Sequence, residues 1–196
     1  MKTIVFDMYG VIMKDPKGGL VPFINRTFPN LKDEDVYKYW IKAGTGEMTA
    51  LDFWRNLGFK NPEEAEKIYL ETIEIDEDFY KVADKLKSHY NLALLSNDVA
   101  EWSSFIRKKY NLNQYFDISI VSGEVHLRKP NPEIFSLLLQ KLNKQPNDCI
   151  YIDDRRTNLE IAHKMGLNTI LFNSRNMPYD GKIVNSFSEL YQLLLD

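Results

Sequence analysis

Five short runs of apolar and β-branched residues recur along the chain, and stretches with helical spacing separate them. The runs are TIVFD (3–7), LALLS (92–96), DISIV (117–121), CIYID (149–153) and NTILF (168–172). Several are continuous rather than alternating, which is typical of parallel strands that helices cover on both faces. The alternation therefore predicts an α/β fold, a three-layer sandwich with a parallel central sheet and right-handed crossovers.

The segment between the first two runs breaks this alternation. It has no strand-like run but three helical patterns, DEDVYKYWIKAG (33–44), TALDFWRNL (49–57) and NPEEAEKIYLETIEI (61–75). Connections in α/β units are usually 2–6 residues beside one helix, so a segment of about 60 residues is long for a plain crossover. We predict a helical cap (15–78) inserted into a Rossmann-like core (1–14 and 79–196). A long helical crossover is the alternative.

Composition excludes several classes of protein. The net charge of -3 gives no electrostatic footprint for nucleic acid. One cysteine, Cys149, excludes an internal disulfide framework and a cysteine-rich zinc site. No stretch approaches 18 apolar residues, and the apolar start is too short for a signal peptide. We therefore expect a cytoplasmic protein with neither a nucleic-acid nor a membrane partner. The oligomeric state, monomer or homodimer, stays open.

Polar residues stand at the ends of three predicted strands. Asp7 ends the first, Ser96, Asn97 and Asp98 end the second, and Asp153 and Asp154 end the fourth. Ligands of an open parallel sheet bind at the carboxyl ends of its strands. One such aspartate is often only a helix cap, but three such strand ends at one edge predict a functional site.

The motifs around these residues resemble those of one family. FDMYGVI (6–12), LALLSND (92–98), RKPNPEIF (128–135) and YIDDRRTNLEIAHKMGLNTILF (151–172) follow in that order. They are similar to the four motifs of the haloacid dehalogenase-like hydrolase superfamily, and the cap position matches its subfamily IA, which has a helical C1 cap. GEMTALDFWRNLG (46–58) resembles a cap segment of glucose-1-phosphate phosphatases and of the N-terminal phosphatase domain of epoxide hydrolases.

The resemblance implies a role for each site residue. Asp7 would be the nucleophile that forms an aspartyl-phosphate. Ser96 would donate a hydrogen bond to a phosphoryl oxygen, with support from Asn97. Lys129 would neutralise both the phosphoryl group and the carboxylate of Asp7.

The same resemblance implies a magnesium site. Asp7, Asp153 and the backbone carbonyl of Tyr9 would bind Mg²⁺, which prefers oxygen ligands. Asp154 and Asn158 would hold its waters. If Lys129 is the only cation beside the three aspartates, about two negative charges remain uncompensated, and a divalent cation would keep Asp7 ionised.

Tyr9 departs from the phosphatase pattern. Most phosphatases of the superfamily have a second aspartate there, which protonates the leaving oxygen. The pattern D-x-Y-G is associated with L-2-haloacid dehalogenases, which use the same nucleophile on carbon without a metal. Asp98, Asp15 or Glu47 could supply the missing acid, and the sequence does not choose among them.

The fourth motif separates the two activities. Dehalogenases resemble S-S-N-x-x-D there, whereas this chain has Asp153, Asp154 and Asn158, the metal-binding form. Dehalogenases also need a cap arginine, and Arg26 and Arg55 lie in no motif of that kind. We therefore predict a Mg²⁺-dependent phosphatase of a small phosphorylated metabolite, with a sugar phosphate as a candidate. The alternatives are a 2-haloacid dehalogenase and a phosphometabolite-binding protein of low turnover.

Overall fold

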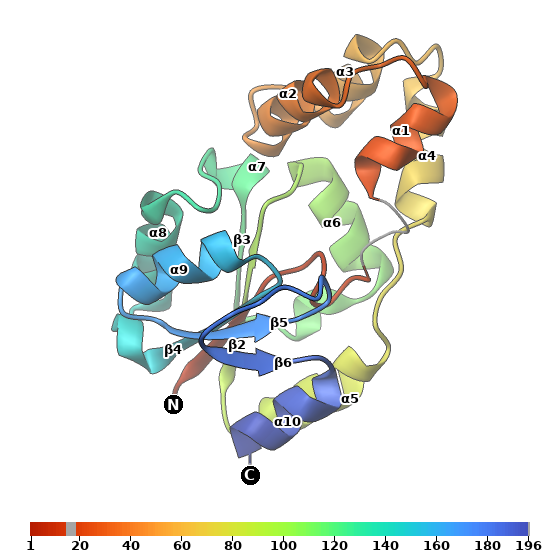
Figure 1. Cartoon of the computed structure of the whole chain (residues 1–196). Coiled ribbons are helices and arrows are strands. Elements are labelled where there is room, and N and C mark those ends of the chain that lie inside the picture. The colour runs from red at the N-terminus through yellow and green to blue at the C-terminus, as the bar shows by residue number, and fades with distance from the viewer. Residues whose placement is uncertain (15–18, 196) are drawn as a thin grey trace.

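The computed structural model describes residues 1–14 and 19–195, and its strands form one parallel sheet (Figure 1). The strand order is β3-β2-β1-β4-β5-β6. The bounds are β1 (Thr3–Phe6), β2 (Asn91–Ser96), β3 (Ile118–Val121), β4 (Cys149–Asp153), β5 (Asn168–Phe172) and β6 (Lys182–Val184). Each of the five apolar runs contains a strand, so the predicted α/β fold is confirmed. β6 is absent from the prediction because only Val184 of its three residues is buried.

The α-helices of the described residues lie between these strands in the chain, except that none separates β5 from β6 and that α10 follows β6. They are α1 (Leu20–Thr27), α2 (Asp33–Gly44), α3 (Ala50–Asn56), α4 (Pro62–Glu71), α5 (Asp78–Leu86), α6 (Ala100–Lys109), α7 (Ser122–Val125), α8 (Pro132–Leu142), α9 (Arg156–Lys164) and α10 (Phe187–Leu195). Local chemistry explains where some begin. Asn61 and Asn131 each accept a hydrogen bond from the first turn of α4 and α8, and a proline opens each helix.

Two apolar cores lie on opposite faces of the sheet. Ile4 and Phe6 of β1 pack in one core with α5, α6 and α10. Val5 points to the other face and packs with α8 and α9. Successive residues of a strand face opposite sides, so a continuous apolar run such as β1 serves both cores. This arrangement produces the three predicted layers.

Helices α1–α4 form a separate layer at one end of the molecule, between β1 and β2 in the chain (Figure 1). All three helical patterns of this segment form helices. α1 is an additional helix that the sequence does not predict, because Pro22 interrupts its pattern and only Ile24 is buried. No helix of the described ranges is both long and apolar enough to span a membrane.

An aromatic cluster joins this layer to the rest of the molecule. The ring centroids of Trp54 and Tyr69 lie 5.8 and 5.2 Å from that of Trp102 on α6. The indole of Trp102 also donates a hydrogen bond of 2.9 Å to Glu66. The two parts therefore share one apolar core, and the division into a core and a cap at residue 78 stays a prediction.

Candidate active site

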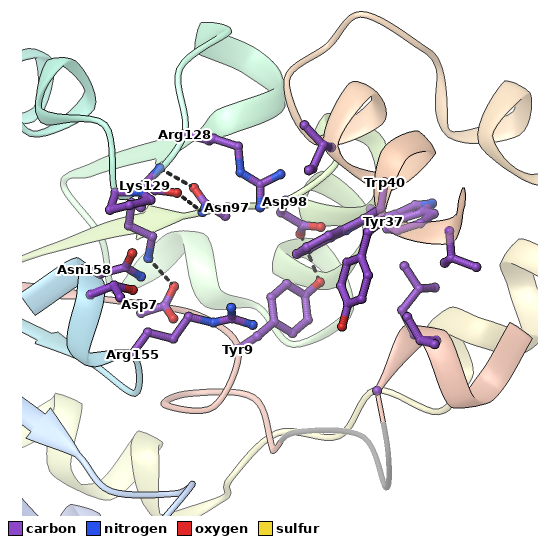
Figure 2. A pocket seen from close by; sticks show the side chains of 18 of the residues that line it. Asp7, Tyr9, Tyr37, Trp40, Asn97, Asp98, Arg128, Lys129, Arg155 and Asn158 are labelled. Carbon is purple, nitrogen blue, oxygen red and sulfur yellow. Dashed lines mark hydrogen bonds and ion pairs between the residues drawn. The ribbon is translucent and has the colours of Figure 1, made fainter. Parts of the chain in front are cut away.

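A cavity of about 410 Å³ lies between the strand ends and helices α1 and α2 (Figure 2). Asp7, Asn97, Lys129 and Asn158 line it from the side of the sheet. Apolar side chains of the two helices line the opposite wall: Leu20, Val21, Pro22, Val36, Tyr37, Trp40 and Ile41. The edge predicted to bind a ligand thus opens into a partly enclosed cavity.

Lys129 bridges two of the predicted site carboxylates. Its Nζ donates hydrogen bonds to Asp7 Oδ1 at 2.6 Å, to Asp153 Oδ2 at 2.9 Å and to the backbone oxygen of Leu95 at 2.8 Å. Burial by itself would lower the pKa of Lys129, but Asp153 and Asp7 raise it above its ordinary value. The lysine is therefore a fixed positive charge between the two acids.

Asp153 is held in place from several directions. The amide of Asn158 donates to both its carboxylate oxygens, at 3.1 and 3.0 Å. The backbone N–H of Arg155 donates to Oδ1 at 2.7 Å, and the hydroxyl of Tyr151 donates to Oδ2. These contacts leave Asp153 one orientation, which is what a metal ligand or an electrostatic anchor requires.

Asp7 has an unusual protonation equilibrium. Burial raises the pKa of its carboxyl group to about 7, the ammonium group of Lys129 lowers it, and the charges of Asp153 and Asp154 raise it. Lys129 alone therefore does not keep Asp7 fully ionised at neutral pH. Additional positive charge at this point would favour the carboxylate that a nucleophile needs.

The three aspartates fit a divalent cation. Carboxylate oxygens of Asp7, Asp153 and Asp154 lie within 4.8 Å of one another. Oδ1 of Asp154 is buried and has no hydrogen-bond partner among the described residues. A buried oxygen of this kind is costly to leave unpaired, and hard oxygen ligands suit Mg²⁺.

Arg175 corrects the charge count made from the sequence. That count took Lys129 as the only cation beside the three aspartates, and it is wrong in this respect because Nε of Arg175 donates to Asp154 Oδ2 in an ion pair. The nominal excess is one negative charge rather than two. The uncompensated charge therefore supports a divalent cation less strongly, and the main support is the arrangement of the three carboxylates.

Gly10 packs directly behind Asp154. Its backbone has a φ of +84°, which favours glycine, and a β-carbon there would lie 2.6 Å from Cγ of Asp154. The loop is tight, since Gly10 N donates to the carbonyl of Met13 and Ile12 N to that of Met8. The turn after the nucleophile therefore sets the position of the second acid of the fourth motif.

Tyr9 is paired with one of the three candidate acids. Its hydroxyl donates to Asp98 Oδ2 at 3.0 Å, and burial raises the pKa of Asp98 to about 8. Both residues line the cavity. Glu47 is exposed and accepts a hydrogen bond from Thr45 away from the cavity walls, and Asp15 lies outside the described residues.

The two neighbouring residues at the end of β2 differ in their surroundings. Asn97 contacts the backbone of Lys129 twice, by donating to its carbonyl and accepting from its N–H, both at 2.8 Å. Ser96 is fully buried, does not line the cavity and has no hydrogen-bond partner in the described part of the chain. Asn97 thus orients the loop of Lys129, while the phosphoryl contact of Ser96 stays a prediction.

Three arginines near the site have no role in the sequence prediction. Arg128, Arg155 and Arg175 all line the cavity. Arg128 precedes Lys129 and Arg155 follows Asp154 inside the quoted motifs. Their positions next to site residues could have identified them from the sequence. Arg175 follows β5 in a loop without a motif. The cap arginines Arg26 and Arg55 do not line the cavity, and Arg55 pairs with Asp52 on the surface.

A family model described as haloacid dehalogenase-like hydrolase matches residues 1–166. A phosphorylated carbohydrates phosphatase of Thermotoga maritima is 24% identical over 181 residues, 87% of this chain and 84% of that protein. An (S)-2-haloacid dehalogenase of Burkholderia cepacia is 30% identical over 124 residues, 60% of this chain. The bifunctional epoxide hydrolase 2 of Mus musculus is 43% identical over 60 residues, 31% of this chain. The matches span 54% of the dehalogenase and 11% of the epoxide hydrolase.

Solved structures show the same fold. A HAD family enzyme of Bacteroides thetaiotaomicron, in complex with magnesium and inorganic phosphate, has a TM-score of 0.78 at 19% identity, covering 92% of this chain and 98% of its own. An L-2-haloacid dehalogenase has a TM-score of 0.75 at 17% identity, covering 100% and 99%. Phosphate-binding and dehalogenating proteins thus share this architecture, and only the residues of the site can separate the two activities.

Proposed function

The chain is a member of the haloacid dehalogenase-like hydrolase family, and from that premise we propose that it is a Mg²⁺-dependent phosphatase of small phosphorylated metabolites. One observation carries the proposal: Asp7 lines the cavity beside Lys129 and within a cluster of three carboxylates. The donor set of that cluster suits a hard divalent cation. Cytoplasmic location and a monomeric or dimeric state stay predictions.

The first step forms a covalent intermediate on Asp7. A carboxylate oxygen attacks phosphorus, a new O–P bond forms, and the ester O–P bond breaks. The leaving oxygen keeps the electron pair of that bond and takes up a proton from water, so that the alcohol is released. Lys129 lies 2.6 Å from the attacking carboxylate and balances the charge of the transferred phosphoryl group. Asn97 holds the lysine loop in place through its backbone. Water then hydrolyses the aspartyl-phosphate, which releases inorganic phosphate and restores Asp7.

The residues that would hold Mg²⁺ are Asp7, Asp153 and the backbone carbonyl of Tyr9, with Asp154 and Asn158 around it. When bound, the ion supplies positive charge that stabilises the ionised Asp7 and the phosphoryl oxygens. Arg175 already neutralises one oxygen of Asp154. Asn158 fixes both oxygens of Asp153 and so preserves its orientation.

Tyr9 limits the leaving groups that this site handles well. Loss of a general acid costs about 10²–10⁴ in rate, and good leaving groups lose less because they need less protonation. Burial raises the pKa of Tyr9 well above its ordinary value, so its hydroxyl keeps its proton and donates to Asp98. Substrates with a stable leaving group, such as a sugar 1-phosphate, suit this arrangement.

The segment 15–78 acts in this proposal as a cap that selects the substrate. Its helices α1 and α2 supply the apolar wall of the cavity, and closure of such a cap over a bound substrate would exclude water from the reacting groups. Substitutions in this wall should change which phosphate is preferred.

Hydrolysis of 4-nitrophenyl phosphate with Mg²⁺, with EDTA and with the variant Asp7→Asn tests the proposal. We expect activity only in the wild type with Mg²⁺. The exposed Asp78, which pairs with Lys81 on α5, gives a matched control in Asp78→Asn. Activity that survives both chelation and the loss of Asp7 would overturn the proposal.

A metal-independent 2-haloacid dehalogenase is the second candidate. Tyr9 favours it, as does the similarity to the Burkholderia cepacia enzyme. Halide release from 2-chloropropionate in EDTA would establish this activity, and its absence together with phosphatase activity would exclude it. A phosphometabolite-binding protein of low turnover is the third candidate. It predicts that the chain binds a phosphate ester but shows neither phosphatase nor dehalogenase activity.

A further inference from the structure

Two guanidinium groups that form no ion pair with a described residue line the cavity. Arg128 and Arg155 both line it, and among residues 1–14 and 19–195 no carboxylate forms an ion pair with either. Burial lowers the pKa of Arg128, and the charge of Arg155 lowers it further. The two groups are thus close enough for their like charges to repel each other, which costs free energy in the unliganded protein.

The surrounding residues keep both arginines directed at the cavity. The guanidinium carbon of Arg128 lies 4.8 Å from the centre of the Trp40 ring, on α2. Arg155 is anchored at its backbone by the hydrogen bond to Asp153. Figure 2 shows both side chains entering the space between Asp7 and the rings of Tyr37 and Trp40.

The site acids form their ion pairs with other cations, although the charge of Arg155 contributes to lowering the pKa of Asp154. Lys129 contacts Asp7 and Asp153, and Arg175 pairs with Asp154. Arg128 and Arg155 therefore remain as positive charge on the substrate side of the site. The planar fork of a guanidinium matches a carboxylate or a phosphate through paired hydrogen bonds.

We propose that the substrate carries a second anionic group, a carboxylate or a second phosphate, which Arg128 and Arg155 bind while its phosphoryl group lies at Asp7. The inference rests on the proposed phosphatase activity and narrows its substrate class. The carbon skeleton between the two anions then lies against the apolar wall of α1 and α2. A second anion relieves the repulsion between the guanidinium groups, so binding it gains free energy that a singly anionic ester cannot.

Two matched substrate pairs test the proposal and separate the two kinds of anion. Glycerol 3-phosphate and 3-phosphoglycerate differ by a carboxylate, and fructose 6-phosphate and fructose 1,6-bisphosphate differ by a phosphate. We expect kcat/KM of the wild type to favour the doubly anionic member of at least one pair about 10- to 100-fold, the range expected for hydrogen bonds to charged groups. R128Q and R155Q should each lower this preference about tenfold.

Arg156→Gln is the matched control, because Arg156 neighbours Arg155 but pairs with Glu160 on the surface. It should keep the wild-type preference. Calorimetric titration of Asp7→Asn with the same two pairs measures binding without turnover, and we expect the doubly anionic ligand to bind more tightly. Thermal melting checks that each variant folds.

The outcomes separate this inference from the proposed function. If 4-nitrophenyl phosphate is hydrolysed but neither pair shows a preference, the second-anion site is wrong and the phosphatase stands. A preference that R128Q and R155Q both retain also overturns the site. If no phosphate ester is hydrolysed, the proposed function is wrong. The anion site is then tested by calorimetry alone, and it is wrong as well if Asp7→Asn binds both members of each pair with equal affinity.

Discussion

The two sides of the cavity are built from different interactions. The floor, which we define as Asp7, Asn97, Lys129, Asp153 and Asn158 on the side of the sheet, consists of polar groups that hydrogen bonds join, all of them buried except the half-buried Asn97. The roof, which we define as Leu20, Val21, Val36, Tyr37, Trp40 and Ile41 of α1 and α2, consists of apolar side chains. Tyr37 is 49% exposed and Ile41 is 45% exposed. Hydrogen bonds fix the floor, whereas the roof is partly exposed at Tyr37 and Ile41 and buried at Val36.

This difference assigns chemistry to the floor and selection to the roof. A polar group of the floor that loses its partner is buried and unpaired, which is expensive. An apolar side chain of the roof that is replaced by another loses only contact area. Substitutions in the two regions should therefore differ in both size and kind.

Loss of the nucleophile should have the largest effect. Asp7→Asn should reduce kcat for 4-nitrophenyl phosphate about 10⁴-fold or more, since the other carboxylate of the floor, Asp153, does not line the cavity. Steady-state kinetics measure this loss, with thermal melting as a check of folding. A variant that folds and retains a tenth of the activity would mean that another group carries out the attack.

Removal of the central cation should damage the fold as well as the activity. Lys129→Met leaves Asp7 and Asp153 without their shared partner and should lower the free energy of unfolding by about 3–5 kcal/mol at pH 8. The loss should be smaller at pH 5, because the unpaired carboxylates can then take up protons. Urea unfolding at both pH values measures it, with the exposed Lys81→Met as control. Equal losses at both pH values would contradict this electrostatic account.

Substitution of Tyr9, which lines the cavity near the floor, should have an intermediate effect on turnover. Tyr9→Asp supplies the second acid that most phosphatases of the family use, and it should raise turnover of alkyl phosphates about tenfold or more relative to aryl phosphates. Tyr9→Phe, which only removes the hydrogen bond to Asp98, is the matched control. An equal change for both substrate types would mean that protonation of the leaving group does not limit the rate.

The smallest effect is expected in the roof. Trp40→Leu removes the ring beneath Arg128, a contact worth about 0.5–2 kcal/mol, and should raise KM for doubly anionic esters about 2- to 30-fold. KM should change more than kcat, because the contact acts on binding. Trp40→Phe keeps an aromatic face and should restore most of the affinity. A change confined to kcat would place Trp40 in the chemical step instead.

The sequence predicts the floor better than the roof. Asp7 and Asp153 come from motifs at strand ends, and the ends of parallel strands necessarily meet at one edge of the sheet. Lys129 comes from the motif RKPNPEIF in a loop before α8. The roof depends on how α1 and α2 pack, which no local pattern specifies. Two tryptophans of the predicted helical patterns illustrate the limit: Trp40 (pattern 33–44) lines the cavity, whereas Trp54 (pattern 49–57) is fully buried.

Arg175 and α1 escaped the prediction for related reasons. Arg175 reaches Asp154 from a loop after β5, and its pairing depends on tertiary structure alone. α1 contains a proline and buries one residue, so it carries little periodicity. The metal site and the roles of the individual residues stay predictions, because geometry shows which groups meet but not what reacts there.

Gly10 has a consequence for how such a site can diverge. Every other amino acid carries a β-carbon, and at this position that carbon would collide with Asp154. A one-codon change at Gly10 therefore displaces an acid that belongs to a motif more than a hundred residues away. At Tyr9, by contrast, the side chain lines the cavity, and no β-carbon constraint of this kind applies to its backbone. New activities can thus arise by mutation at position 9, while position 10 is closed to them, and a library built to redesign this enzyme should randomise the first and leave the second untouched.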